Sequence, residues 1–414
     1  MTIESATGTT TGSDDGHDGA RGAAGPDLPD LAVDPDLASM IADILAGFSG
    51  PSVEPDPAAV WRTLTEVGLA RLTAPEASGG SGAGWAEAAA LIRQSAAAGV
   101  CVPYVETDLV VGPVRRAAAL DDTAPGTSTL AVVGAGGRAR RVAWAGATDT
   151  VLFVRRAAPM VGGDGAPDPD GTAGNGRDND PDDDEAAPTR AGGYEVAEIA
   201  TDRIELAPGG STSSIPIGDM VPPSEAQWSP VPAGAVENAV LTGALARAVQ
   251  CVGAAEGMLD AALAHTTART QFGRPLARFQ SVQNLVVDLA AETVLARAAV
   301  DQAVADALVT GLDGPLSGFR VAVARSVTSE ALGVAVRNAH QVHGAIGTAH
   351  EHTLHRLTLP ALQWRGEFGS AAFWERLLAD AAVSGGMDGA WPMVVEGAAV
   401  DGAAAAWLDR VMRD

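Results

Sequence analysis

The sequence predicts a mostly α-helical protein with a small β domain, in the order N-terminal helical domain, central antiparallel β domain and C-terminal four-helix bundle. Apolar residues recur at helical spacing from Leu37 to about residue 120 and again, over longer stretches, from Ala233 onward. Between about residues 126 and 230 they form short β-branched or alternating runs bounded by Gly, Pro or Asp. A chain of 414 residues exceeds the usual size of a single core, so several domains are expected.

Composition excludes several classes of protein. The net charge is −25, from 27 basic and 52 acidic residues, and such a chain repels a phosphate backbone, so no nucleic-acid partner is expected. The two cysteines, Cys101 and Cys251, lie in apolar surroundings without the spacing of a disulfide framework or a zinc site. Neither a signal peptide nor a membrane span is evident, and a cytoplasmic protein is expected.

Residues 1–35 are rich in Gly, Ser, Thr, Asp and Pro and are predicted to be a disordered tail. Residues 36–124 are predicted to form the N-terminal helical domain. Its helices are expected at residues 37–45, 60–69, 85–98 and 105–120, with a Gly-rich loop over residues 72–84.

Residues 125–232 are predicted to form the β domain, with strands at residues 128–133, 141–144, 150–155, 194–199 and 203–206. Residues 160–193 interrupt it with Gly, Pro, Asn and a run of acids. No fixed ligand spacing for a cation occurs there, so a disordered acidic insertion is predicted.

Residues 233–385 are predicted to form the bundle, followed by a C-terminal extension over residues 386–414. The first bundle helix is interrupted near Gly273 and Pro275, because glycine is too permissive and proline lacks the N–H for a helix interior. Arg269, Arg274 and Arg278 flank this turn. The turn could therefore grip a phosphate, or it could be only the solvated basic corner of a helix hairpin.

Three motifs in the bundle carry a resemblance to a known family: residues 269–276 (RTQFGRPL), 279–283 (FQSVQ) and 341–347 (QVHGAIG). Together with residues 66–76, Gly79-Gly80 and residues 103–107, they resemble the flavin-dependent acyl-CoA dehydrogenase family, in particular its divergent bacterial members. The resemblance covers roughly residues 37–380; it is strong in both helical parts and weak in the β domain.

The resemblance implies FAD bound at a junction between subunits, and therefore at least a dimer. Arg269 is expected to hold the FAD pyrophosphate, while a loop from residue 341 meets the FAD of a neighbouring subunit. By position, the implied cofactor-binding residues are Arg269, Gln271, Phe272, Phe279, Gln280, Gln341, Gly344 and Ala345.

The implied reaction is α,β-dehydrogenation of an acyl-CoA thioester, with a carboxylate as base, hydride transfer to the flavin, and an electron-transfer flavoprotein as the usual acceptor. The family usually places its base directly before a glycine, where this chain has Phe368. Glu367 is therefore the candidate base, displaced by one position, and a structural Glu367 paired with Arg365 or Arg376 is the alternative. Some relatives carry the base earlier, at the place of Gly243 and Ala244, where this chain has no carboxylate.

Three functions remain open from sequence. The first is a self-sufficient FAD enzyme with Glu367 as base. The second is a non-catalytic or accessory subunit of a heteromeric acyl-CoA dehydrogenase, because the family's flavin-covering segments in the β domain are hard to find here. The third is a plain helical scaffold. His343, His350, His352 and His355 gather near the Gly-rich loop, but their spacing matches no metal motif and no metal is expected.

Overall fold

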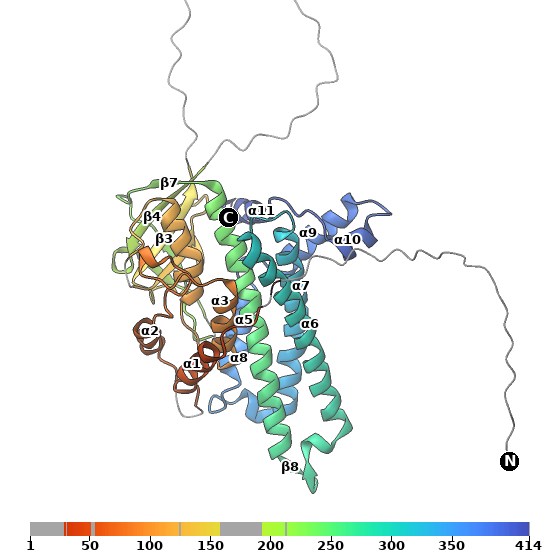
Figure 1. Ribbon diagram of the computed structural model, residues 1–414. Coiled ribbons are helices and arrows are strands. Elements are labelled where there is room, and N and C mark those ends of the chain that lie inside the picture. Colours follow the sequence, from red (N-terminus) through yellow and green to blue (C-terminus); the bar gives the residue numbers. More distant parts are fainter. Residues whose placement is uncertain are drawn as a thin grey trace, which may run out of the picture.

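The computed structural model describes residue 29 and residues 31–50, 54–123, 126–157, 193–211 and 213–413. A helical N-terminal part and a small β part lie beside one end of a long helical bundle (Figure 1). The predicted fold class is thereby confirmed. Most of the predicted tail, and all of the predicted insertion except Gly193, lie outside the described residues.

The N-terminal helices begin where their capping residues predict. Asp34 and Asp56 accept the N–H groups of Asp36 and Ala58 at 2.8 and 3.1 Å, and each is followed by a proline at the first helical position. The part consists of α1 (Pro35–Ala46), α2 (Pro57–Glu66), η1 (Glu76–Ser78), α3 (Trp85–Ala97), the π-helical segment η2 (Val105–Val111) and α4 (Gly112–Ala117).

The β part is two small sheets, ordered β1-β3-β4-β7 and β2-β6-β5. Its first pair, β1 with β3, is parallel, so the prediction of a wholly antiparallel domain is wrong at that pair; the other pairs within the two sheets are antiparallel. The missed strands, β6 and β7, are short and lie among Pro and Gly residues that obscure the alternation. The strands are β1 (Ser128–Val132), β2 (Ala139–Ala143), β3 (Thr150–Arg156), β4 (Tyr194–Ala200), β5 (Glu205–Pro208), β6 (Ile217–Val221) and β7 (Ser229–Val231), with a 3₁₀ turn, η3 (Thr201–Arg203), between β4 and β5.

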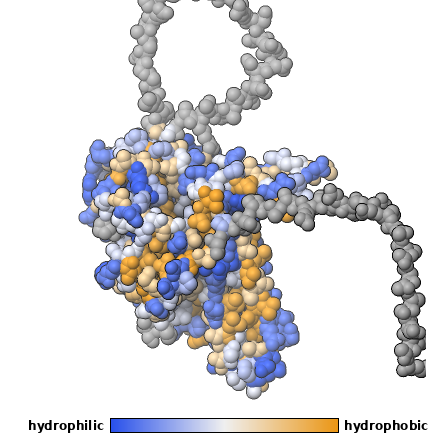
Figure 2. Space-filling view, in the orientation of Figure 1, coloured by the Kyte–Doolittle hydropathy of each residue, from blue (hydrophilic) through white to orange (hydrophobic). Residues whose placement is uncertain are grey.

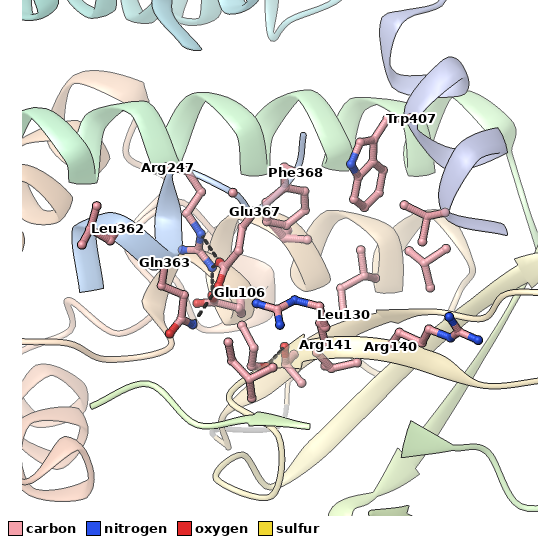
Figure 3. Close-up of a pocket in the computed structure, with 18 residues that line it drawn as sticks. Glu106, Leu130, Arg140, Arg141, Arg247, Leu362, Gln363, Glu367, Phe368 and Trp407 are labelled. Atoms are coloured by element: carbon pink, nitrogen blue, oxygen red, sulfur yellow. Dashed lines mark hydrogen bonds and ion pairs between the residues drawn. The ribbon is translucent and has the colours of Figure 1, made fainter. Parts of the chain in front are cut away.

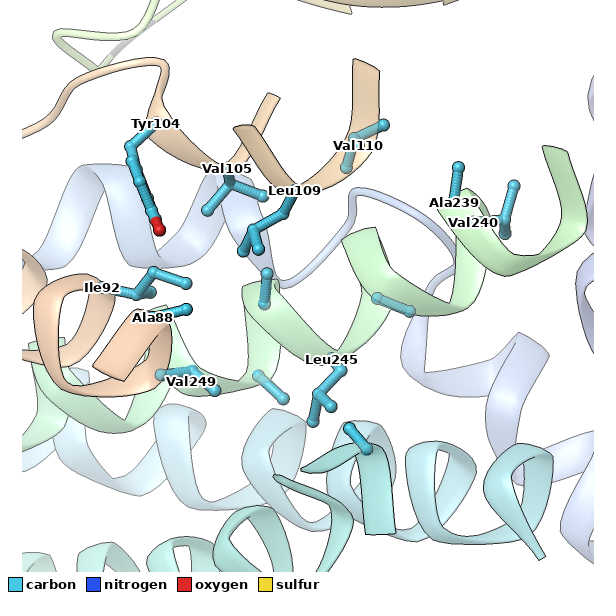
Figure 4. Packing of buried hydrophobic residues seen from close by; sticks show 14 of the residues in the cluster. Ala88, Ile92, Tyr104, Val105, Leu109, Val110, Ala239, Val240, Leu245 and Val249 are labelled. Atoms are coloured by element: carbon cyan, nitrogen blue, oxygen red, sulfur yellow. The ribbon is translucent and has the colours of Figure 1, made fainter. Parts of the chain in front are cut away.

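Helix α5 (Ala233–Ala268) organises the molecule because it is buried on several sides. One side packs on α3, where Ala88 and Ile92 lie close to Val249 (Figure 4). The approach is close: a methyl group on Gly253 would lie 2.2 Å from the Arg93 carbonyl oxygen. The opposite side packs on α6 (Gln280–Thr310) and α7 (Ser317–His343).

The predicted break after α5 is a small hairpin, β8 (Thr270–Gln271) and β9 (Arg274–Pro275), with Phe272 and Gly273 at φ +52° and +79°. It leads through η4 (Leu276–Arg278) into α6. Beyond α7 come η5 (Gly344–Thr348), α8 (His355–Trp364) and α9 (Ala371–Ser384), and the C-terminal extension forms α10 (Ala390–Glu396) and α11 (Ala403–Arg413).

Helix α6 carries apolar side chains that no described part of the chain covers. Val287, Val294, Leu295 and Val309 are 57 to 70% exposed. Hydrophobic colour is visible along the bundle in the space-filling view (Figure 2). An exposed apolar face of this kind is typical of a surface that meets another protein chain.

Candidate active site and cofactor site

A cavity of about 400 Å³ lies between the β part and α5, and we call it the carboxylate cavity (Figure 3). Its charged lining residues are Glu106, Arg140, Arg141, Arg247 and Glu367, and its remaining wall is largely apolar. That wall includes Val110, Leu130, Val132, Val142, Ile217, Leu362, Phe368, Trp407 and Val411. A volume of this size is typical of a site for a small organic ligand.

Arg247 joins the two carboxylates of this cavity. It is 1% exposed, and its guanidinium is paired with Glu106 and donates through Nε to Glu367 at 2.7 Å. A third branch donates to Gln250 at 2.7 Å. Burial alone would lower the pKa of Arg247, but the two carboxylates raise it above its ordinary value, so this guanidinium is charged.

Glu106 is the most deeply buried acid of the cavity. It lies on the π-helical segment η2, a rare geometry that is frequent at functional sites, and it is 3% exposed. Burial raises the pKa of Glu106, while Arg247 opposes the increase. Its Oε2 has no hydrogen-bond partner among the described residues, and a buried polar atom of that kind requires an explanation.

Glu367, the predicted base, lies in the cavity with both oxygens occupied. Oε2 accepts from Arg247, and Oε1 accepts from the Gln363 amide at 2.8 Å. The alternative partners considered from sequence, Arg365 and Arg376, form no ion pair with Glu367 in the described structure; its partner is Arg247. The surrounding loop is fixed by Arg325, which donates to the carbonyls of Glu367 and Gly369 at 2.9 Å.

The two places where the resemblance predicts a base, at Phe368 and near Gly243, contact each other in this chain. An added methyl group on Gly243 would lie 2.5 Å from Cε1 and Cζ of Phe368. Phe368 itself has φ +51° and stacks on Trp407 of α11, with ring centroids 5.7 Å apart. A phenyl ring packed on a glycine therefore lies where the resemblance predicts a carboxylate base.

Arg141 enters the cavity because of a β-bulge. The register between β2 and β6 shifts between Ala139 and Val142, and Arg141 within this interval has φ +51°. Its N–H donates to Asp219 Oδ1 at 2.9 Å, which fixes the bulge. Figure 3 shows the Arg141 guanidinium directed toward Glu106, whereas Arg140, which also lines the cavity, lies farther from Glu106. Bulges commonly redirect side chains in this way beside functional sites.

A second cavity, of about 650 Å³, lies at the far end of the bundle, and we call it the bundle-tip cavity. It brings together the two sequence motifs predicted to hold the cofactor: Arg269 and Gln271 from one, and Gln341, Gly344 and Ala345 from the other. Gly344 has φ +64° and open space around the position of a Cβ, so its backbone is accessible.

The other three predicted cofactor residues do not line this cavity. Phe272 is 90% exposed at the hairpin tip and lies edge-on to Phe279, with centroids 6.1 Å apart. Phe279 carries the Arg274 guanidinium 4.1 Å above its ring, and the Gln280 amide donates to Asn284 at 3.1 Å.

The two cavities are far apart on one helix. Arg247 lines the first and His265 the second, both on α5. Eighteen residues of α-helix at about 1.5 Å each separate them by roughly 27 Å. A ligand held in the bundle-tip cavity is therefore remote from the acids of the same chain.

Histidines also gather at the bundle tip. Nitrogen atoms of His265, His343 and His352 lie within 4.8 Å of one another, a grouping that the sequence spacing did not reveal. However, Nδ1 of His352 accepts the N–H of Leu354 at 3.1 Å, which leaves the proton of the neutral ring on Nε2. This hydrogen bonding suits a neutral imidazole cluster rather than a three-histidine ligand set, and the absence of a metal stays a prediction.

Sequence reasoning missed Glu106, Arg141 and Arg247. A signal existed for one of them: Arg247 is a lone charge within an apolar helical run, which indicates a buried, paired cation. Arg141 carried no such signal, because a bulge depends on the pairing of two strands that are distant in sequence.

Comparisons with known proteins agree with this architecture. Residues 52–119 match the family model "Acyl-CoA dehydrogenase, N-terminal domain", and residues 234–382 match "Acyl-CoA dehydrogenase, C-terminal domain". The chain belongs to the acyl-CoA dehydrogenase family. Members of this family are FAD-binding flavoproteins. None of the helices in the described residues is long and apolar enough to cross a membrane.

Relatives within the family share only part of their length with this chain. "Acyl-CoA dehydrogenase IpdE2" of Mycolicibacterium smegmatis is 35% identical over 113 residues, which are 27% of this chain and 33% of the relative. "3-sulfinopropanoyl-CoA desulfinase" of Paraburkholderia xenovorans is 34% identical over 134 residues, 32% of each chain. The chain thus spans about a third of the length of these curated relatives.

A solved structure extends the likeness of fold over most of the chain. The ChsE4-ChsE5 complex from Mycobacterium tuberculosis matches with a TM-score of 0.67 at 19% identity, over 86% of this chain and 99% of the matched chain. At that identity the likeness concerns the fold alone.

The residues of this chain fit one end of an FAD molecule better than the other. Arg269, the two glutamine amides and the open backbone at Gly344 provide donors for a diphosphate in the bundle-tip cavity. At the ring end, the resemblance predicts a Trp-containing strand that covers the flavin. Here Trp144 is 2% exposed and does not line the carboxylate cavity.

Proposed function

We propose that this chain takes part in FAD-dependent α,β-dehydrogenation of an acyl-CoA thioester and contributes the bundle side of a flavin site shared between two chains. The observation that supports this role is the bundle-tip cavity, where motifs about seventy residues apart in sequence converge. Arg269 would bind the diphosphate, with Gln271 and Gln341 as further donors and the backbone from Gly344 to Ala345 lying alongside.

The reaction needs a carboxylate that takes the α-proton from the thioester. When bound, FAD accepts the β-hydrogen as hydride. In this chain Glu367 is the proposed base. Since Arg247 and Gln363 occupy both of its oxygens, Glu367 would have to release at least one of these partners before it could take a proton.

A second candidate function is supported by Phe368 and Gly243. Because an aromatic contact fills the usual place of the base, the geometry favours an accessory subunit that completes the flavin site of a second acyl-CoA dehydrogenase chain. In that role the acids of the carboxylate cavity would be structural, and an electron-transfer flavoprotein would serve the assembly rather than this chain alone.

Flavin content separates these functions. The chain is purified alone and with co-expressed acyl-CoA dehydrogenase chains from the same source, and the flavin absorbance per chain is recorded. Bound flavin in the isolated chain, with turnover lost in Glu367→Gln, would establish the autonomous enzyme. A colourless chain that gains flavin only in a complex would establish the accessory role.

Arg269→Gln tests the shared site in either case. We expect it to lower the flavin content severalfold, because a diphosphate loses its guanidinium. Arg278→Gln is the matched control, since Arg278 is exposed on the same connection and does not line the cavity. Equal flavin content in both variants would refute the role of the bundle-tip cavity and leave a helical scaffold.

A further inference from the structure

The carboxylate cavity contains two polar groups without a described partner, and they face each other. The Arg141 guanidinium forms no ion pair with any described residue, although it points into the cavity (Figure 3). Glu106 Oε2 is buried and has no hydrogen-bond partner in the same described set. Arg247 donates to Glu106 Oε1, Glu367 and Gln250, and as a cation it offers no acceptor to Arg141.

The position of Arg141 has a structural cost. A non-glycine residue at φ +51° costs of the order of 1 kcal/mol, and the hydrogen bond from its N–H to Asp219 holds it there. Arg141 is an exposed residue at the mouth of the cavity, and the bulge brings its guanidinium to the lining of this partly apolar cavity. Such placement suits recognition of an anionic group within the cavity.

One ligand group would satisfy both residues. A carboxylate accepts two parallel hydrogen bonds from a guanidinium fork, and its remaining lone pairs accept a hydrogen bond from a protonated carboxyl group. Because Glu106 is the ion-pair partner of Arg247, it would have to take up a proton when the ligand binds; burial, which raises the pKa of Glu106, favours this uptake, and Arg247 opposes it. The apolar wall formed by Leu130, Phe368 and Trp407 would then contact the hydrocarbon part of the same ligand.

We infer that the carboxylate cavity binds an acyl group that ends in a carboxylate, with Arg141 as the residue that recognises this end. The substrate class is thus an ω-carboxyacyl-CoA thioester rather than an unsubstituted fatty acyl-CoA. This inference rests on the proposed function, since it assumes that the ligand is an acyl-CoA.

The test compares two thioesters of equal chain length, adipoyl-CoA and hexanoyl-CoA, by isothermal titration of the purified full chain together with any partner that copurifies. Both ligands carry the phosphates of coenzyme A, and only adipoyl-CoA carries the terminal carboxylate. We expect adipoyl-CoA to bind about tenfold to a hundredfold more tightly, the range for a charge-assisted hydrogen bond.

Arg141→Gln should abolish this preference by weakening adipoyl-CoA alone. Arg141→Lys, which keeps the charge without the fork, should retain part of it. Arg138→Gln is the matched control, because Arg138 is an exposed arginine directly before β2 and does not line the cavity. Glu106→Gln should keep most of the preference, since an amide N–H can still donate to the ligand.

Each other outcome contradicts the inference in a recognisable way. Equal affinity for the two ligands in the natural protein would overturn the carboxylate specificity while leaving acyl-CoA binding intact. An Arg141→Gln variant that loses both ligands equally would assign Arg141 to a coenzyme A phosphate instead. Failure of both ligands to bind would overturn the proposed acyl-CoA function itself, and the inference with it.

Discussion

Replacing Arg247 with methionine tests the electrostatics of the carboxylate cavity. Methionine keeps much of the apolar volume and removes the charge that neutralises Glu106 and Glu367. The side chain of Glu106 is 4% exposed and that of Glu367 is 17% exposed, so the charge of Glu106 in particular is left in a poorly solvated place. Breaking a buried ion pair of this kind costs about 3–5 kcal/mol.

The pH dependence gives the sign of the effect. Without Arg247, the pKa of Glu106 rises further above the value of about 4.3 in the unfolded chain. An acid whose pKa is raised by folding stabilises the folded state less as the pH increases between these two values. The destabilisation should therefore be larger near about pH 8 than near about pH 5.

Urea unfolding followed by far-ultraviolet circular dichroism measures this loss. The double variant Arg247→Met with Glu106→Gln should recover a large part of it, because the neutral amide needs no counter-ion. A loss below about 1 kcal/mol at the higher pH would show that water reaches these carboxylates and would refute the buried triad.

Three further predictions concern packing and titration. Gly253→Ala should destabilise the α3–α5 contact by about 1–3 kcal/mol because of the Arg93 carbonyl, whereas Gly333→Ala, with open space on α7, should stabilise by roughly 0.5–1 kcal/mol in the same urea assay. Burial raises the pKa of Cys101 to about 12 and of Cys251 to about 11, so a thiol reagent near pH 8 should modify neither before unfolding and both in denaturant. Burial and neighbouring histidines lower the pKa of His352, so the folded state should lose stability as the pH drops below about 6.5, the pKa of histidine in the unfolded chain. Amide hydrogen exchange near residues 340–355 should then become faster. Unchanged exchange at about pH 5 would contradict this prediction.

Much of the fold could be predicted because helical periodicity and capping act over short distances. The helices expected from residues 37 and 60 begin at Pro35 and Pro57, two and three residues earlier. The parallel β1–β3 pair could not be predicted in the same way, because strand direction depends on contacts between segments rather than on local pattern.

The residues of the candidate sites also differ in how far local sequence pattern could predict them. Arg269 and Gln341 lie in motifs whose residues are neighbours in sequence, and the structure brings the two motifs to one cavity. The surroundings of Glu367 depend instead on Arg247 from α5 and on Glu106 from η2. Arg247 lies 120 residues from Glu367 and 141 residues from Glu106 along the chain. No local pattern reports such a meeting.

The separation of the two cavities along α5 has a consequence for stoichiometry. If the bundle-tip cavity of each chain binds the flavin of a neighbouring chain, and the acids of each carboxylate cavity face a ligand held by the other chain, a pair of chains contains two composite sites. In a pair with one fully functional dehydrogenase chain, this chain would supply the bundle side of its neighbour's flavin site. The site beside its own Phe368 would have no strand to cover the flavin ring and no carboxylate free to act as base. Such an assembly would hold one flavin for every two chains, and a simple count of flavin against polypeptide would distinguish it from a homodimer, which would hold either two or none.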